Sequence, residues 1–167
     1  MTINDSGSLK STESSDLVNL NEVLGISVET LSLDYGNLSV SQVSKPIRQN
    51  VTNAGNIPIN VTVRGFGGDD EDIGQNVTMI CDPTVSITNI TFNNQRFDTK
   101  NDTAFAGMYN LTNQTRQIFN LTIPQRTTDN SFGNSSNSTF WRLQIPLGAG
   151  GVCNGTIIFG AIDAINH

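Results

Sequence analysis

A strict two-residue alternation over residues 57–64 is the feature that most constrains the fold of this chain. The apolar phase is Ile57, Ile59, Val61 and Val63, and the polar phase is Pro58, Asn60, Thr62 and Arg64. This period is that of a β-strand with one covered face. The preceding segment, Asn53-Ala54-Gly55-Asn56, carries turn chemistry, so residues 47–64 predict a β-hairpin. Pro58 places its strand at a sheet edge or at the first position of the strand.

Shorter apolar runs predict the remaining strands, and none of them has a convincing helical period. In residues 118–123 the alternation directs Phe119, Leu121 and Ile123 inward, and Asn120 and Thr122 outward. Residues 155–164 are apolar on both phases, which predicts a central, well-covered strand. The other strand segments expected are 26–33, 38–40, 77–80, 85–92, 108–112 and 141–145.

Short strands separated by frequent turn residues predict an all-β chain with a single antiparallel β-sandwich or jelly-roll-like domain. Residues 1–16 are rich in Ser, Thr and Asp and are expected to form a flexible polar arm. The β-sandwich domain is then expected to span residues 17–167, a length that suits one domain.

The chain has few charged residues and many small polar residues. Only 14% of the residues are charged, against roughly 25% in an average domain, and the net charge is −6. Nine Lys and Arg against fifteen acidic residues give no basic field, so a nucleic-acid partner is not expected. No apolar run reaches the roughly 18 residues of a membrane span. The chain instead holds 21 Asn, 15 Ser and 18 Thr.

Many of these asparagines begin N-x-S/T triplets, the acceptor pattern for N-glycosylation. There are 13 such triplets, where roughly four would arise at random from this composition. Strand alternation with an Asn/Thr outer face explains part of the excess, so a polar strand face without sugar is the alternative. The predicted acceptors are Asn37, Asn50, Asn60, Asn76, Asn89, Asn101, Asn110, Asn113, Asn120, Asn134, Asn137 and Asn154, with Asn4 as a further triplet in the arm.

The two cysteines, Cys81 and Cys153, are consistent with one disulfide or with two buried thiols. The glycosylation triplets favour an oxidising, extracellular compartment and therefore the disulfide. Such a bridge closes a loop of about 70 residues and is worth about 4 kcal/mol in the chain-entropy treatment. Residues 1–10 are polar, so a secreted form is expected to have lost a leader peptide.

Candidate chemistry is sparse, and no enzyme is expected. The single histidine is the terminal His167, and no nucleophile motif, phosphate loop or dinucleotide fingerprint is present. Asp69, Asp70 and Asp72 form a weak Ca²⁺ candidate whose alternative is a solvated acidic turn. Trp141 suits sugar stacking or core packing, and its alternation with Leu143 and Ile145 favours the core. Arg64 and Arg142 are expected on solvated outer faces of strands. No cofactor is expected apart from covalent N-glycans.

Two stretches resemble a known group of proteins. Residues 47–63, IRQNVTNAGNIPINVTV, are similar to the strand, N-x-G-N, strand hairpin of secreted archaeal β-sandwich domains. Residues 141–146, WRLQIP, followed by 155–159, GTIIF, resemble the ending of the same domains. More loosely, the chain is similar to TasA-type matrix proteins and archaeal bundling pilins. This resemblance implies a jelly-roll subunit that donates an N-terminal strand to its neighbour.

These observations lead to one principal functional hypothesis and two alternatives. The principal one is a structural subunit of an extracellular, heavily glycosylated filament or surface layer, a head-to-tail homopolymer built by strand donation. The candidate donated strand lies within residues 17–33. The alternatives are a carbohydrate-binding or adhesion module of a larger cell-surface protein, and a jelly-roll viral coat protein.

Overall fold

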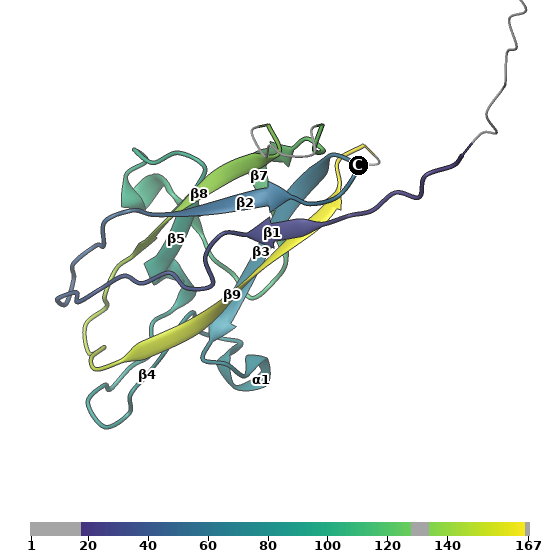
Figure 1. Cartoon of the computed structure of the whole chain (residues 1–167). Helices are drawn as coiled ribbons and strands as arrows, with labels where there is room; N and C mark the ends of the chain where they lie inside the picture. The colour runs from purple at the N-terminus through teal and green to yellow at the C-terminus, as the bar shows by residue number, and fades with distance from the viewer. Residues whose placement is uncertain (1–17, 128–133, 166–167) are drawn as a thin grey trace, which may run out of the picture.

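The computed structural model describes residues 18–127 and 134–165, and these residues form two antiparallel sheets packed face to face (Figure 1). The five-stranded sheet has the order β1-β2-β8-β5-β6, and the four-stranded sheet has the order β4-β9-β3-β7. The fold is therefore the expected β-sandwich. The strands are β1 (Ile26–Val28), β2 (Ile47–Asn53), β3 (Ile59–Gly67), β4 (Ile80–Cys81), β5 (Gln95–Asp98), β6 (Tyr109–Asn110), β7 (Arg116–Ile123), β8 (Ser136–Leu143) and β9 (Cys153–Asp163). Three single-turn helices complete the described elements: α1 (Glu71–Gly74), η1 (Phe92–Asn94) and η2 (Phe105–Gly107).

The main core lies between the two sheets. Trp141 on β8 is completely buried, and its ring centroid lies 5.0 Å from that of Phe97 and 5.9 Å from that of Phe159. Its indole Nε1 donates to Thr139 Oγ1 at 2.9 Å, which satisfies the one polar atom of the ring. Core packing, rather than sugar stacking, is thus the role of Trp141. The other buried core residues are Val51, Ile59, Val61, Val63, Leu111, Ile118, Leu121 and Ile123.

The predicted hairpin over residues 47–64 is wrong, although both of its strands form. β2 belongs to the five-stranded sheet and β3 to the four-stranded sheet, so the connection crosses between the sheets. The buried Asn53 fixes this crossing: its Nδ2 donates to the carbonyl oxygens of Ile57 (2.8 Å) and Ile123 (3.2 Å), and its Oδ1 accepts from Gly55 N. Pro58 immediately precedes β3, which is an interior strand between β7 and β9.

The prediction that the Phe119 side chain points into the core is also wrong. Phe119 is 65% exposed, whereas Ile118 and Leu121 are buried. The register between β3 and β7 shifts at this point, and Asn120 adopts a left-handed backbone with φ 57°. A bulge of this kind reverses the alternation of a strand, because extra residues separate two inward positions.

Several predicted strands are shorter than expected or absent. β1 ends at Val28, residues 38–40 form no strand, and most of 85–92 is a loop in which Val85 and Ile87 are exposed. In the segment that follows β1, apolar side chains pack against the two hydrophobic clusters without strand pairing: Leu33, Tyr35 and Leu38. Apolar content alone did not distinguish such packing from strand pairing.

Candidate functional site

The outer edge of β9 is open over most of its length. β9 pairs with β3 from Gly155 to Asp163, but β4 pairs with it only at Cys153 and Asn154. Among the described strands, none pairs with the other side of residues 155–163. The predicted central, fully covered strand is therefore wrong for this stretch. In an antiparallel pair, every second residue directs its N–H and C=O away from the partner strand, so this edge offers unpaired backbone groups.

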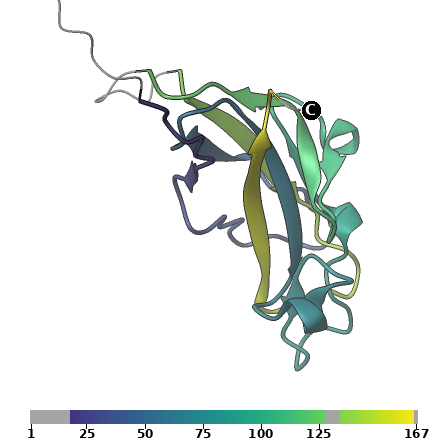
Figure 2. The ribbon, with the colours of Figure 1, turned by 90° about the vertical axis from the view of Figure 1, so that its right-hand side faces the viewer.

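A groove of about 720 Å³ lies beside this open edge. Ile157 and Phe159 of β9 form one wall, and the segment 28–40 that follows β1 forms the other. Figure 2 shows β9 at the side of the sandwich with this purple-to-blue segment beside it. The floor is formed mainly by apolar side chains of both sheets and their loops, namely Met79, Ile90, Leu143, Ile145 and Ala149.

Polar side chains also reach the groove, and they form a buried hydrogen-bonded chain. Thr78 Oγ1 donates to Gln95 Oε1, and Gln95 Nε2 donates to Tyr35 Oη at 2.8 Å. Burial raises the pKa of Tyr35 well above its usual range, an effect only partly offset by the hydrogen bond from Gln95. The sequence did not predict these hydrogen bonds, because Gln95 and Tyr35 lie 60 residues apart and carry no local signal.

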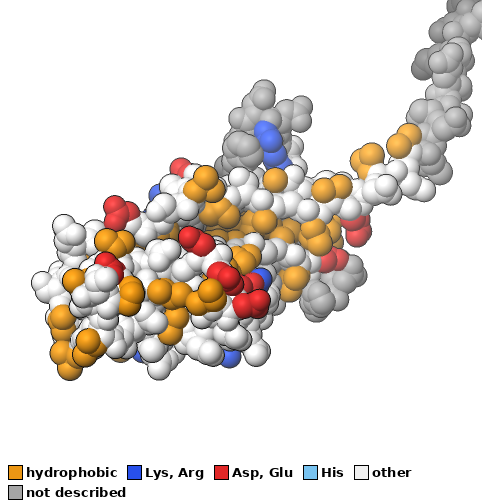
Figure 3. Space-filling view, turned by 90° about the horizontal axis from the view of Figure 1, so that it is seen from below, with side chains coloured by type: hydrophobic (Ala, Val, Ile, Leu, Met, Phe, Trp, Pro, Cys, Tyr) orange, Lys and Arg blue, Asp and Glu red, His pale blue; other side chains and the backbone are white. Residues whose placement is uncertain are grey.

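The N-terminal arm, taken from here on to include residues 18–24 ahead of β1, carries apolar side chains that do not pack against the domain. Val18 is 79% exposed and Leu20 is 83% exposed. The described part of the arm extends away from the sandwich, and hydrophobic side chains follow it (Figure 1 and Figure 3). In the candidate donated strand 17–33, Ile26–Val28 already pair with β2 of the same chain. Leu17 and the predicted polar arm 1–16 lie outside the described residues.

The arm is attached to the domain at the crossing between β2 and β3. Val23 N donates to Asn56 Oδ1 at 2.7 Å, and Asn56 N donates to the Val23 carbonyl at 3.1 Å. Gly55 lies directly beneath this contact: a Cβ there would lie 2.1 Å from the Val23 oxygen. Asn56 Nδ2 also binds the carbonyl of Asn21. Among the described residues, 18–20 therefore lie ahead of the attachment.

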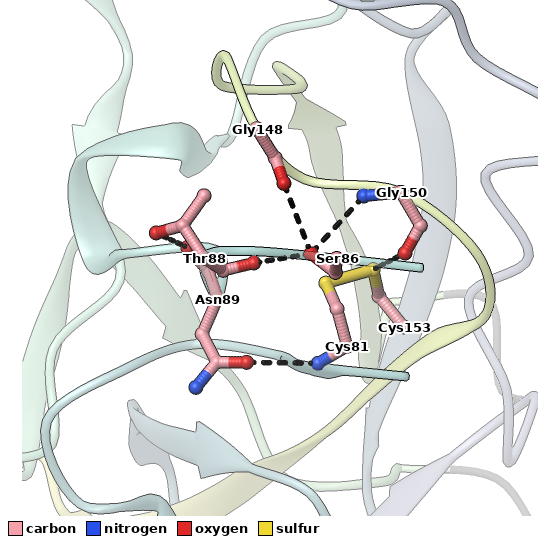
Figure 4. The surroundings of a disulfide bond; sticks show 7 residues. All are labelled: Cys81, Ser86, Thr88, Asn89, Gly148, Gly150 and Cys153. Carbon is pink, nitrogen blue, oxygen red and sulfur yellow. Dashed lines mark hydrogen bonds between the residues drawn. A yellow bond between two sulfur atoms is a disulfide. The ribbon is translucent and has the colours of Figure 1, made fainter. Parts of the chain in front are cut away.

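The predicted disulfide is confirmed. Cys81 and Cys153 are direct cross-strand partners on β4 and β9, and their sulfur atoms are bonded. Around this bridge (Figure 4), Ser86 Oγ donates to the carbonyls of Thr88 (2.6 Å) and Gly148 (3.2 Å) and accepts from Gly150 N (3.2 Å). Ser86 thus joins two loops, 82–89 and 146–152, next to the bridge, and Gly150, Gly151 and Cys153 line the groove. In the first loop, hydrogen bonds from the Thr84 hydroxyl and amide lower the pKa of Asp82.

The glycosylation triplets are found mostly at the surface. Asn60 differs: it is 8% exposed, and its Oδ1 accepts a 2.6 Å hydrogen bond from Thr122 Oγ1 on β7. Asn50 is half-buried and donates to Glu29. Asn4 lies outside the described residues. The exposed acceptors are Asn37, Asn76, Asn89, Asn101, Asn110, Asn113, Asn120, Asn134, Asn137 and Asn154.

In the acidic loop, one carboxylate caps a helix, and the carboxylates do not converge on a common site. Asp70 is the N-cap of α1, and its Oδ1 accepts from Asp72 N at 3.0 Å. Glu71 pairs with Arg64, which raises the pKa of that guanidinium. Asp69 and Asp72 are exposed. Within the described ranges, no three Asp, Glu, His or Cys side chains come together in a cluster that could hold a metal ion.

The fold and these features define an antiparallel β-sandwich in which β9 has an unpaired outer edge next to the one described disulfide. No protein-family model matches the chain, and no curated protein matches it either. In the described part of the chain, no helix has the length and apolar character needed to cross a membrane.

Proposed function

We propose that this chain is a structural subunit of an extracellular, N-glycosylated filament or surface layer, and that each copy donates its N-terminal arm as a strand to the next copy. The observation that carries the proposal is that one molecule holds both a sheet edge without a partner strand and an apolar segment without a covering surface. The edge of β9 lacks a strand beside a groove lined by both apolar and polar side chains, and the arm presents Val18 and Leu20 without a covering surface.

Strand addition would satisfy both features at once. A donated strand would hydrogen-bond to the open edge of β9, and its alternate side chains would enter the groove between Phe159 and the 28–40 segment. Val18 and Leu20 lie two positions apart, so in an extended strand they point to the same face. Because donor and acceptor are different surfaces of one chain, the contact is heterologous and propagates into an open, head-to-tail polymer.

The chemistry of the surface supports an extracellular location within this proposal. The Cys81–Cys153 disulfide persists in oxidising compartments. Ten of the described acceptor asparagines are exposed, so their amide nitrogens are accessible to a glycosyl donor. Covalent glycans would hydrate a surface that has few charges and would shield its open edges. The proposed role is non-enzymatic.

Electron microscopy of the native protein, together with sedimentation of purified variants, tests the proposal. The double variant Val18→Asp/Leu20→Asp is expected to stay monomeric, because two carboxylates packed against the apolar side chains of the groove would carry a large desolvation penalty. The matched control, Asn19→Asp/Asn21→Asp, adds the same charge on the other face of the arm and is expected to polymerise. Monomers in the native preparation, or equal polymerisation of the two double variants, would contradict strand donation. Closed shells would indicate the coat-protein alternative.

A second candidate function is carbohydrate binding by a module of a larger cell-surface protein. It is favoured by the size of the groove and by the polar side chains of Gln49, Gln95 and Thr30 along it. This candidate predicts a stable monomer that binds a neutral oligosaccharide saturably. Substituting Gln95 would weaken that binding, whereas the Val18→Asp/Leu20→Asp variant would bind normally.

A further inference from the structure

Three of the six arginines lie together on the outer face of the five-stranded sheet. Arg48 on β2 is the cross-strand partner of Phe140 on β8, and Arg96 on β5 is the partner of Arg142 on β8. Directly opposed residues point to the same face of a sheet, as do residues two apart on one strand. Arg48, Arg96 and Arg142 therefore form one group, called here the arginine row, on a protein whose net charge is −6.

The positive charge of this row is not balanced by neighbouring side chains. Like charges placed directly opposite each other, as in Arg96 and Arg142, destabilise a sheet. Within the described residues, no arginine of the row forms an ion pair with a carboxylate. The carboxylates on the same face have other partners: Asp98 Oδ1 accepts from Lys100 N, and Glu29 accepts from the Asn50 amide.

The three guanidinium groups are not equally free. Arg96 is held by the carbonyls of Asn93, Phe105 and Ala106 and lies over the Phe105 ring, so it contributes charge and positions a loop. Arg48 uses only its Nε, which donates to Ser138 Oγ at 2.9 Å. Arg142 makes one long contact, from Nη2 to the Asn101 carbonyl at 3.5 Å.

Arg142 also holds an unsatisfied atom. Its Nε is the one buried side-chain nitrogen or oxygen without a hydrogen-bond partner in residues 18–127 and 134–165. A buried donor left without a partner costs free energy, so a small movement of this guanidinium toward an acceptor would be favourable. Free guanidinium forks bind planar carboxylates, and tetrahedral oxyanions such as sulfate, through two parallel hydrogen bonds.

The same face carries the attachment points for sugar. Asn110 is the cross-strand partner of Arg96, Asn50 lies next to Arg48 in the hydrogen-bonded chain through Ser138, and Asn101 contacts Arg142. Phe140 lies between Arg48 and Asp98 and offers an apolar ring surface for a pyranose. We infer that the arginine row binds an acidic saccharide, one that carries uronate or sulfate groups, supplied either by the chain's own glycans or by a separate polysaccharide.

The binding of polygalacturonate and dextran sulfate to protein made in a host without N-glycosylation tests this site. Both polymers are expected to bind in a salt-sensitive manner, and neutral dextran is not. Arg48→Gln and Arg142→Gln are each expected to weaken binding about tenfold, the effect of losing one charge-assisted contact. Arg116→Gln removes an exposed arginine from β7 in the other sheet and is expected to bind as the unsubstituted protein does.

Two further comparisons separate the effect of charge from that of the guanidinium geometry and identify the source of the saccharide. Arg142→Lys keeps the charge but loses the planar fork, so it is expected to bind more weakly than the unsubstituted protein while melting at a similar temperature. Native glycosylated protein that binds polygalacturonate only after enzymatic deglycosylation would identify the chain's own glycans as the source, and equal binding before and after would identify a separate polysaccharide.

The inference is overturned if neither acidic polymer binds, or if Arg48→Gln, Arg142→Gln and Arg116→Gln weaken binding equally. It is also overturned if the row instead binds a second copy: in that case Arg48→Gln would reduce self-association and leave polymer binding unchanged. Because saccharide binding is measured on the soluble Val18→Asp/Leu20→Asp variant as well, its outcome is separate from that of strand donation.

Discussion

Cys81 lies directly opposite Cys153, and the disulfide between them joins β4 to β9 at the only described point where β9 has a second strand partner. Beyond this point the outer edge of β9 is open. The bridge therefore marks the boundary between the closed and the open part of the four-stranded sheet. It lies next to the Ser86 hydrogen bonds that join the loops 82–89 and 146–152.

Removing this bridge is expected to destabilise the domain while leaving the main core around Trp141, which contains neither cysteine, in place. The double variant Cys81→Ser/Cys153→Ser should lose about 4 kcal/mol of unfolding free energy, because the 72-residue separation between the cysteines is no longer constrained in the unfolded chain. Denaturant unfolding followed by Trp141 fluorescence measures the change. Hydrogen exchange should rise first at residues 80–90 and 146–154. An unchanged unfolding midpoint would contradict this role.

The occupancy of the glycosylation triplets is expected to follow burial. Asn60 should carry no sugar, because its side chain is buried and its Oδ1 is bound by Thr122. Asn113 and Asn120 are exposed and should be accessible. Glycopeptide mass spectrometry of the native protein measures each position. A glycan found at Asn60, with Asn113 and Asn120 empty, would show that burial in this fold does not govern occupancy.

Gly55→Ala is expected to release the arm from the domain. The new Cβ would lie 2.1 Å from the Val23 carbonyl oxygen, so the contact between the arm and the Asn56 turn must open. Limited proteolysis should then cleave residues 21–25 faster. The control is Ala54→Ser, which changes the exposed neighbouring side chain and should leave cleavage unchanged. Equal cleavage of both variants would mean that Gly55 does not hold the arm in place.

The free energy of unfolding is expected to fall at alkaline pH because Tyr35 is buried in its protonated form. Burial raises the pKa of Tyr35 in the folded protein, so the folded state retains a proton that the unfolded state loses above about pH 10. The contribution is fully present below that pH and is lost as the pH rises toward the folded pKa. Tyr35→Phe should show a smaller alkaline loss in thermal melts than Tyr109→Phe, which alters an exposed tyrosine. Identical alkaline slopes for the two variants would contradict this assignment.

The sequence predicted the all-β class, the sandwich and the disulfide, because alternation and cysteine pairing are local or pairwise signals. It did not predict the partners of the strands. The turn at residues 53–56 identified a reversal, but the choice between a hairpin and a sheet crossing depends on where Asn53 finds its distant acceptor, the Ile123 carbonyl. The bulge at Asn120 likewise reverses Phe119 and Ile118 through one left-handed residue that the alternation does not reveal.

The candidate site was predictable only in part. The sequence proposed residues 17–33 as the donor because apolar side chains follow a polar arm, and among the described residues only 18–20 lie ahead of the contacts that attach the arm to the domain. The proposed acceptor, the outer edge of β9, was not predicted, because a strand paired on both sides and a strand with one unpaired edge can have the same apolar composition. The arginine row was missed for a related reason: Arg48, Arg96 and Arg142 come together only through the register of three strands.

Hydrogen exchange of the β9 amides in the assembled and dissociated states tests the central claim most directly. Strand donation predicts that the outward-facing amides of residues 156–162 exchange rapidly in the monomer and become protected in the polymer. The Val18→Asp/Leu20→Asp variant should remain unprotected, and a peptide of residues 1–24 should restore protection without polymerisation. Polymers in which these amides exchange as rapidly as in the monomer would show that the open edge of β9 is not the acceptor.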